Sequence, residues 1–139
     1  MNIKSIHHVA IIASDYKKSK QFYTEVLGLE IIRENYRSER DSYKLDLKLG
    51  TSEIELFSFP YRTKRPTQPE AAGLRHLCFY VDDFDEAIQS LNEKGVETEP
   101  VRVDEYTGGR FTFFKDPDNL PLELHEWHIF WTLYKNALR

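Results

Sequence analysis

Two histidines and two glutamates stand at matching positions along the 139-residue chain. An offset of 68 positions separates His8 from His76, and the same offset separates Glu55 from Glu123. Imidazole nitrogens and carboxylate oxygens suit a borderline divalent ion such as Ni, Co, Zn, Mn or Fe(II). Both glutamates lie inside apolar segments, where an unpaired carboxylate is costly to bury and a bound ion removes that cost. The four residues therefore predict one divalent metal ion per site.

The segments around these residues repeat together with them. Residues 8–15 read HVAIIASD and residues 76–83 read HLCFYVDD, while SEIEL at 52–56 corresponds to LPLEL at 120–124. Asp15 and Asp83 keep the same offset, and Ser14 or Asp15 can cap the helix that follows the first of these segments. The chain is therefore interpreted as two copies of one module.

Hydrophobic periodicity predicts the same order of elements in both copies. The first copy has expected strands at 3–13, 29–36, 42–50 and 53–59 and a helix at 16–27, and the second has strands at 74–81, 96–103, 110–115 and 120–125 and a helix at 83–94. The dense apolar residues of 3–13 indicate a strand covered on both faces. Each copy is thus β-α-β-β-β, and the fold class is α+β.

The two modules are expected to form a single domain over residues 1–139. Module one spans 3–59, a proline-containing linker spans 60–72, module two spans 73–125, and a tail spans 126–139. The tail is rich in apolar and aromatic residues, so we expect a helix packed on the body of the protein or on a partner chain.

Composition excludes several classes of function. The net charge of −4 gives no electrostatic case for nucleic-acid binding. The apolar segments are too short to span a membrane, and a lone cysteine, Cys78, permits no intrachain disulfide. A cytoplasmic protein with a small-molecule substrate is the expectation.

Strand alternation also predicts which side chains lie near the metal ligands. Phe57 and Phe59 share the face of Glu55, and Tyr80 shares the face of His76. Arg110 is the candidate to hold an anionic group of the substrate, because guanidinium groups bind carboxylates with two hydrogen bonds. The remaining histidines have no counterpart in the repeat, and His128 in the tail is not expected to be a ligand.

The order and common offset of these motifs resemble the vicinal oxygen chelate superfamily. That superfamily includes glyoxalase I, fosfomycin- and bleomycin-resistance proteins and extradiol dioxygenases. The matching segments cover most of residues 3–125 and include FKDPD at 114–118 followed by LEL at 122–124. The resemblance implies paired modules that form a cupped mixed sheet around a central metal, with His8, Glu55, His76 and Glu123 as ligands, in a homodimer.

The glyoxalase branch implies a lyase or isomerase in which a metal-stabilised enediolate forms and a carboxylate moves the proton. Either Glu123 or Glu55 would be that base, and the internal symmetry does not distinguish them. Two alternatives remain open. An Fe(II) extradiol-type dioxygenase would use two histidines and one glutamate, and a resistance-type protein would bind small molecules without catalysis.

Two positions depart from the pattern of glyoxalases that act on glutathione adducts. Such proteins commonly carry an arginine four residues after the first ligand and an asparagine four residues after the second. Here the two positions hold Ile12 and Phe59. We therefore expect a small oxygen-chelating substrate other than a glutathione adduct.

Overall fold

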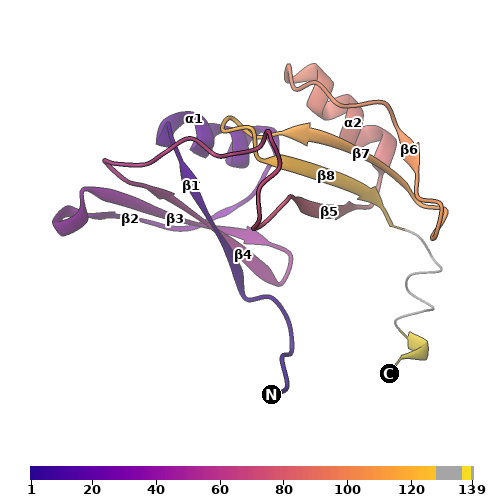
Figure 1. The fold of residues 1–139 in the computed structure, drawn as a ribbon, viewed down its shortest axis with the longest axis horizontal. Coiled ribbons are helices and arrows are strands. Elements are labelled where there is room, and N and C mark those ends of the chain that lie inside the picture. The colour runs from indigo at the N-terminus through magenta and orange to yellow at the C-terminus, as the bar shows by residue number, and fades with distance from the viewer. Residues whose placement is uncertain (128–135, 139) are drawn as a thin grey trace. The chain divides into compact units, whose positions relative to one another are not determined.

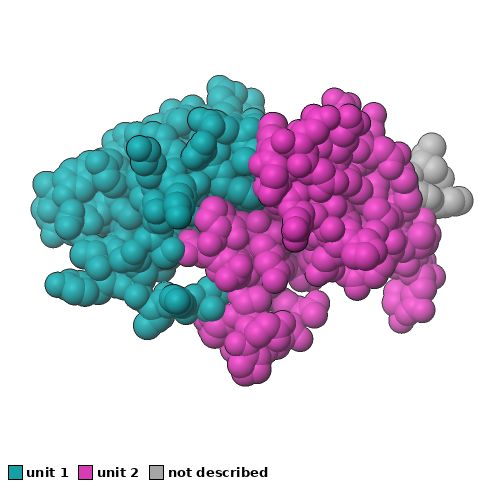
Figure 2. Space-filling model, turned by 90° about the horizontal axis from the view of Figure 1, so that it is seen from above, with its two compact units in different colours: residues 1–65 teal, residues 66–139 magenta. Residues whose placement is uncertain are grey.

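The computed structural model describes residues 1–127 and 136–138. The chain divides into two compact units, residues 1–65 and residues 66–139, which are coloured separately in Figure 2. The boundary falls inside the predicted linker 60–72. Each unit holds one four-stranded mixed sheet, so the predicted α+β fold of two tandem modules is confirmed.

The sheet of the first unit has the strand order β1-β4-β3-β2 (Figure 1). Its strands are β1 (His8–Ala13), β2 (Ile31–Arg37), β3 (Ser42–Leu49) and β4 (Ser52–Ser58). β1 runs parallel to β4, and the other two pairs are antiparallel. The first and last strands of the module are therefore neighbours, which brings residues near position 8 beside residues near position 55.

The helical segment of the first unit begins where the sequence predicts it. The Asp15 carboxylate accepts a hydrogen bond from the backbone N–H of Lys18 at 3.1 Å, which caps α1 (Tyr16–Gln21). The helix continues as a π-helical segment, η1 (Phe22–Val26), and a short 3-10 helix, η2 (Ser38–Arg40), follows β2. Gly28 adopts a φ of 72° just beyond η1, as expected for a residue that ends a helix.

Apolar side chains on one face of this sheet form the core with the helical segment. Leu45 and Leu47 of β3 and Ile54 and Leu56 of β4 are fully buried, as is Tyr23 of η1. We call this the helix face of the sheet. The opposite face carries His8 and Glu55, and we call it the ligand face in both units.

The first strand is shorter than predicted. It begins at His8, and the expected extension to residue 3 is wrong, because Ile3 and Ile6 lie outside the sheet and are exposed. Ile12 is also 53% exposed, so the strand buries only the helix-face residues Ile11 and Ala13. The dense apolar run therefore did not mean a strand covered on both faces.

The second unit repeats the topology with the strand order β5-β8-β7-β6 (Figure 1). Its elements are β5 (Leu77–Val81), α2 (Phe84–Glu93), β6 (Arg102–Val103), β7 (Arg110–Lys115) and β8 (Pro121–Glu126). The Asp83 carboxylate caps α2 by accepting from the N–H of Glu86 at 3.0 Å. β6 has two residues where a strand over 96–103 was predicted, and Pro100 has no N–H to extend its ladder.

The predicted helix over 126–139 falls mostly on residues 128–135 and 139, which lie outside the described residues. Glu126 is instead the last residue of β8. No helix within the described ranges is long and apolar enough to cross a membrane.

Candidate functional site

His8 and Glu55 meet on the ligand face of the first unit. The parallel register of β1 and β4 pairs Ala10 with Glu55, and His8 lies two residues before Ala10 on the same face. The His8 Nε2 atom lies 3.4 Å from Glu55 Oε2. The carboxylate is 13% exposed and the imidazole 41%, so the pair lies at the surface of the unit with its glutamate largely buried.

His76 and Glu123 form the same arrangement in the second unit. β5 runs parallel to β8 with Cys78 opposite Glu123, and His76 lies two residues before Cys78. The His76 Nε2 atom lies 3.1 Å from Glu123 Oε2. The two halves of the sequence repeat therefore have the same local geometry: in each unit, Nε2 of the histidine faces Oε2 of the glutamate across a pair of parallel strands.

The surroundings of the two glutamates differ. Glu55 Oε1 lies 3.0 Å from the Lys44 ammonium, whereas Oε2 faces His8. Lys44 also lies 2.7 Å from Asp46, a fully buried carboxylate of the same strand, β3. Asp46 and, to a lesser extent, Glu55 raise the pKa of Lys44 above its ordinary value. Lys44 thus pairs with Oε1 of Glu55, while Oε2 faces His8.

The environment of Glu123 is more apolar. Its register partner on β7 is Phe113, whose ring makes an edge contact with His76 at 5.1 Å between centroids. Among the described residues, His76 is the only basic side chain within ion-pair distance of Glu123. Burial, together with the charge of Glu123, raises the pKa of the Cys78 thiol to about 12. Cys78 therefore stays a neutral hydrogen-bonding neighbour of Glu123 at physiological pH.

Three carboxylates gather on the ligand face of the first unit. One oxygen from each of Asp46, Glu53 and Glu55 lies within 4.8 Å of the others. Arg33 lies 2.5 Å from Asp46 and 3.7 Å from Glu53, and Lys44 bridges Asp46 and Glu55. Two cations therefore already compensate this cluster, and we do not interpret it as a separate metal site.

The aromatic residues predicted to line the site lie beside the ligand pairs. Phe57 and Phe59 stack with nearly parallel rings, 5.9 Å between centroids, on the face of Glu55. Tyr80 lies on the face of His76, where its ring meets His125 at 5.8 Å and Trp127 at 4.9 Å. Each unit thus has an aromatic surface along its ligand strands.

Arg110 lies on the other face of its sheet. Its side chain shares the helix face of β7 with the buried residues Thr112 and Phe114. Its guanidinium lies 3.0 Å from Asp85 of α2, 2.9 Å from Glu126 of β8, and over the Phe84 ring. Two carboxylates therefore hold Arg110 as a link between α2 and the sheet, which counts against the predicted role in binding substrate.

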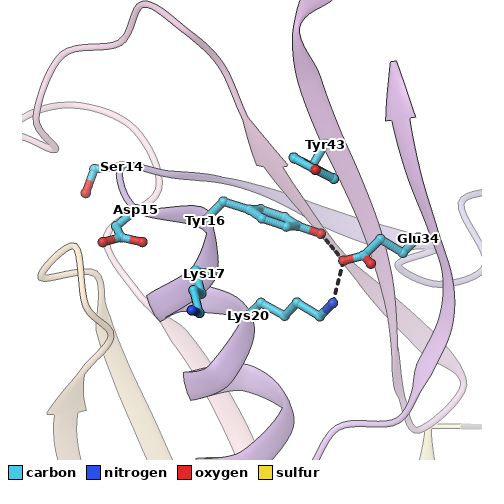
Figure 3. A pocket seen from close by; sticks show the side chains of 7 residues that line it. All are labelled: Ser14, Asp15, Tyr16, Lys17, Lys20, Glu34 and Tyr43. Atoms are coloured by element: carbon cyan, nitrogen blue, oxygen red, sulfur yellow. Dashed lines mark hydrogen bonds and ion pairs between the residues drawn. The ribbon is translucent and has the colours of Figure 1, made fainter. Parts of the chain in front are cut away.

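A hollow of about 620 Å³ lies on the helix face of the first unit (Figure 3). Tyr16 stacks on Tyr43 and donates a hydrogen bond to Glu34, which also pairs with Lys20 at 2.7 Å. Glu34 and Tyr43 flank Leu45 in the strand register, so they share its face. The hollow is therefore separate from the histidine–glutamate pair.

Sequence reasoning missed Lys44, Asp46 and Arg33 as members of the ligand face. Lys44 and Asp46 alternate with the buried residues Leu45 and Leu47 along β3, but only the strand order shows that their face adjoins Glu55. No local motif marks these residues, because the contact arises from antiparallel pairing with β4.

Comparison with known proteins finds a matching family model, similar sequences and similar structures. Residues 5–124 match the model of the Glyoxalase/Bleomycin resistance protein/Dioxygenase superfamily. An uncharacterized Bacillus subtilis (strain 168) protein, YwkD, is 65% identical over 127 residues, covering 91% of this chain and 99% of its own. The crystal structure of a glyoxalase family protein from Enterococcus faecalis is 58% identical, with a TM-score of 0.83 over 91% of this chain and 100% of that one.

A more distant relative has a named activity. The lactoylglutathione lyase of Schizosaccharomyces pombe is 29% identical over 149 residues, covering 89% of this chain and 48% of that protein. The similarity thus extends from close relatives that match over their whole length to a longer enzyme that matches over about half of its own.

Proposed function

Because the chain belongs to the glyoxalase/bleomycin resistance protein/dioxygenase superfamily, we propose that it is a metal-dependent lyase or isomerase of glyoxalase I type. The observation that carries the proposal is the repeated histidine–glutamate pair, with Nε2 to Oε2 distances of 3.4 Å and 3.1 Å. The proposed substrate is a small molecule with neighbouring oxygen atoms that can chelate a metal.

The donor set fits a divalent transition ion. Two imidazoles and two carboxylates suit Ni, Co, Zn, Mn or Fe(II), and four protein ligands leave positions for substrate oxygens when coordination rises to five or six. We propose that His8, Glu55, His76 and Glu123 hold one ion, either within one chain or across a homodimer. When bound, the ion would stabilise the negative charge that develops on the substrate oxygens.

We assign the proton transfer to Glu123. The Lys44 ammonium lies 3.0 Å from Oε1 of Glu55, so one oxygen of this carboxylate is already paired with a cation. No lysine or arginine among the described residues pairs with Glu123, which lies beside Phe113 and Cys78. Because of this difference in neighbours, we propose that Glu123 would take a proton from one substrate carbon and return it to the neighbouring carbon.

Metal analysis tests the ligand set. Purified protein loaded with nickel should contain about one ion per chain, and His8→Ala or His76→Ala should lose most of it. His128→Ala is the matched control and should keep the full content. If the wild-type protein binds no Ni, Co, Zn or Mn, the proposal fails. Mixing the His8→Ala and His76→Ala chains should restore binding only if the site is shared across two chains.

A pair of glutamate variants tests the base. Glu123→Gln should abolish exchange of the substrate proton with solvent deuterium in the metal-loaded protein, whereas Glu55→Gln should mainly weaken metal binding. Equal loss of exchange at saturating metal would refute the assignment of different roles. The exchange is followed by NMR and is independent of product formation.

We further propose that glutathione adducts are poor substrates. Ile12 and Phe59 replace the polar residues that glutathione-dependent relatives place at these positions, and Ile12 is 53% exposed on the face of His8. An apolar side chain cannot pair with a carboxylate, and each missing contact costs about 1–3 kcal/mol. A spectrophotometric assay of the methylglyoxal–glutathione hemithioacetal should show slow turnover, and efficient turnover would contradict the proposal.

A further inference from the structure

Most cations on the ligand face of the first unit are already paired. Arg33 lies close to Asp46 and Glu53, and Lys44 bridges two carboxylates. Arg37, the last residue of β2, is different. Its pairing with Ser42 places it on the same face, yet within residues 1–127 and 136–138 no carboxylate lies within ion-pair distance of its guanidinium.

The guanidinium of Arg37 is held in place by neutral groups. Its carbon lies 5.0 Å from the centre of the Phe57 ring and 5.8 Å from that of Phe59. Its Nη2 donates a hydrogen bond to the Ser42 hydroxyl at 2.7 Å, and this hydroxyl in turn donates to the Ser58 carbonyl. The Nε atom is buried and meets no acceptor among the described residues. The cation is therefore oriented and partly desolvated, but its charge is not compensated.

Arg37 lies over Phe57, which is the next residue after the proposed ligand Glu55 on the same face of β4. Phe57 follows Glu55 by two residues on β4, which is about 7 Å along a strand. Both side chains project from the same face, and the guanidinium of Arg37 stands over the Phe57 ring. A molecule whose oxygens bind an ion held by Glu55 could therefore extend past Phe57 and reach Arg37.

We propose that Arg37 binds an anionic group, a carboxylate or a phosphate, on the substrate of the metal site. The inference rests on the proposed function, and it narrows the substrate to an oxygen-chelating molecule with a negative charge at its far end. The guanidinium suits both anions because it forms two parallel hydrogen bonds. The stacked rings of Phe57 and Phe59 would contact the carbon chain between the two ends of the substrate.

The second unit offers a matched control. Arg102 lies over Phe111 and Phe113 at 5.0 Å and 5.4 Å, as Arg37 lies over its own aromatic pair. Arg102 differs because Glu99 lies 3.0 Å from it, and both side chains are about half exposed. Its charge is already compensated, so it should not contribute to anion binding.

The test uses hydroxamates, which chelate metal ions through two neighbouring oxygens. Acetohydroxamate is the neutral probe, and chelators that carry a carboxylate or a phosphonate at the far end of a short carbon chain are the anionic probes. Affinities for the nickel-loaded full chain are measured by calorimetry, at low and at high salt. The variants are Arg37→Met and Arg102→Met, with thermal unfolding as a check on folding.

For the wild-type protein, one of the anionic probes should bind about 10- to 100-fold more tightly than acetohydroxamate, since hydrogen bonds to charged groups contribute on that scale. The advantage should fall as salt rises. Arg37→Met should remove the extra affinity for the anionic probe and leave acetohydroxamate binding unchanged. Arg102→Met should retain the extra affinity. Comparing the carboxylate with the phosphonate identifies which anion the site prefers.

Other outcomes separate the two proposals. If acetohydroxamate does not bind the nickel-loaded wild-type protein, the proposed metal site fails. If acetohydroxamate binds but neither anionic probe binds more tightly than it does, the role of Arg37 is refuted and the metal site stands. The same conclusion follows if the Arg37→Met protein still binds an anionic probe as much more tightly than acetohydroxamate as the wild-type protein does. If the Arg37→Met protein does not fold, the Arg37→Lys protein is measured instead. An ammonium group forms fewer hydrogen bonds than a guanidinium, so this variant should retain only part of the extra affinity for the anionic probe.

Discussion

Replacing Lys44 with methionine should weaken both the fold of the first unit and its hold on metal. The change keeps a long apolar side chain and removes the ammonium that lies 2.7 Å from Asp46 and 3.0 Å from Glu55. Asp46 is fully buried, so it would depend on Arg33 alone for charge compensation. Glu55 would also lose its ion pair at Oε1, and this ion pair orients the carboxylate so that Oε2 faces His8.

The expected loss of stability lies between two limits. An exposed ion pair contributes about 0–1 kcal/mol, and breaking a buried one costs about 3–5 kcal/mol. The Lys44 side chain is 26% exposed while its two partners are 0% and 13% exposed, so we expect about 2–3 kcal/mol, since Arg33 still compensates part of the charge. Metal affinity should fall about 10- to 100-fold, the usual effect of removing a group that orients a ligand.

Urea unfolding of the metal-free protein and competition with a metal chelator measure these two quantities. Lys48→Met is the matched control, because Lys48 is an exposed lysine of the same strand and lies opposite Glu53. It should change stability by less than about 0.5 kcal/mol. If Lys44→Met binds metal more tightly than the wild-type protein, Lys44 competes with the ion for Glu55, and its positioning role is refuted.

Three further predictions concern residues outside the proposed metal site. Hydrogen bonds from Lys20 and Tyr16 hold the pKa of Glu34 below the ordinary value for a glutamate, so the stability that Glu34 contributes is present above that ordinary value and is lost as the pH falls through the lowered pKa. Glu34→Gln should therefore lower the unfolding temperature at neutral pH and match the wild type in strong acid; a constant difference would contradict this. A Cβ atom on Gly109 would lie 2.6 Å from the His125 ring, so Gly109→Ala should cost about 1–3 kcal/mol in urea unfolding, and adding His125→Ala should recover most of it. Arg110→Met should lower stability by about 1–2 kcal/mol by removing the two ion pairs to Asp85 and Glu126, yet leave hydroxamate affinity unchanged; a selective loss of anionic-probe binding would support its predicted substrate role.

The sequence by itself determined the tandem modules and the residue types of the proposed ligands. A histidine at the start of one strand and a glutamate on another recur at one offset, and this regularity is visible without any structure. The sequence also predicted where the two helices begin, to within one residue, because helix starts depend on side chains within one turn, although it left Ser14 and Asp15 open as the first cap. Local chemistry and repetition therefore sufficed for the order of helices and strands within each module.

Only the tertiary structure decided which residues accompany the ligands. Alternation assigns a side chain to one of two faces, but it does not tell which face the helix covers or which strand lies alongside. For this reason the sequence did not reveal that Arg110 pairs with Asp85 of α2, or that Lys44 contacts Glu55 through the pairing of β3 with β4. His8 and Glu55 meet because the first and last strands of the module are parallel neighbours, a contact between segments 47 residues apart that no local pattern encodes.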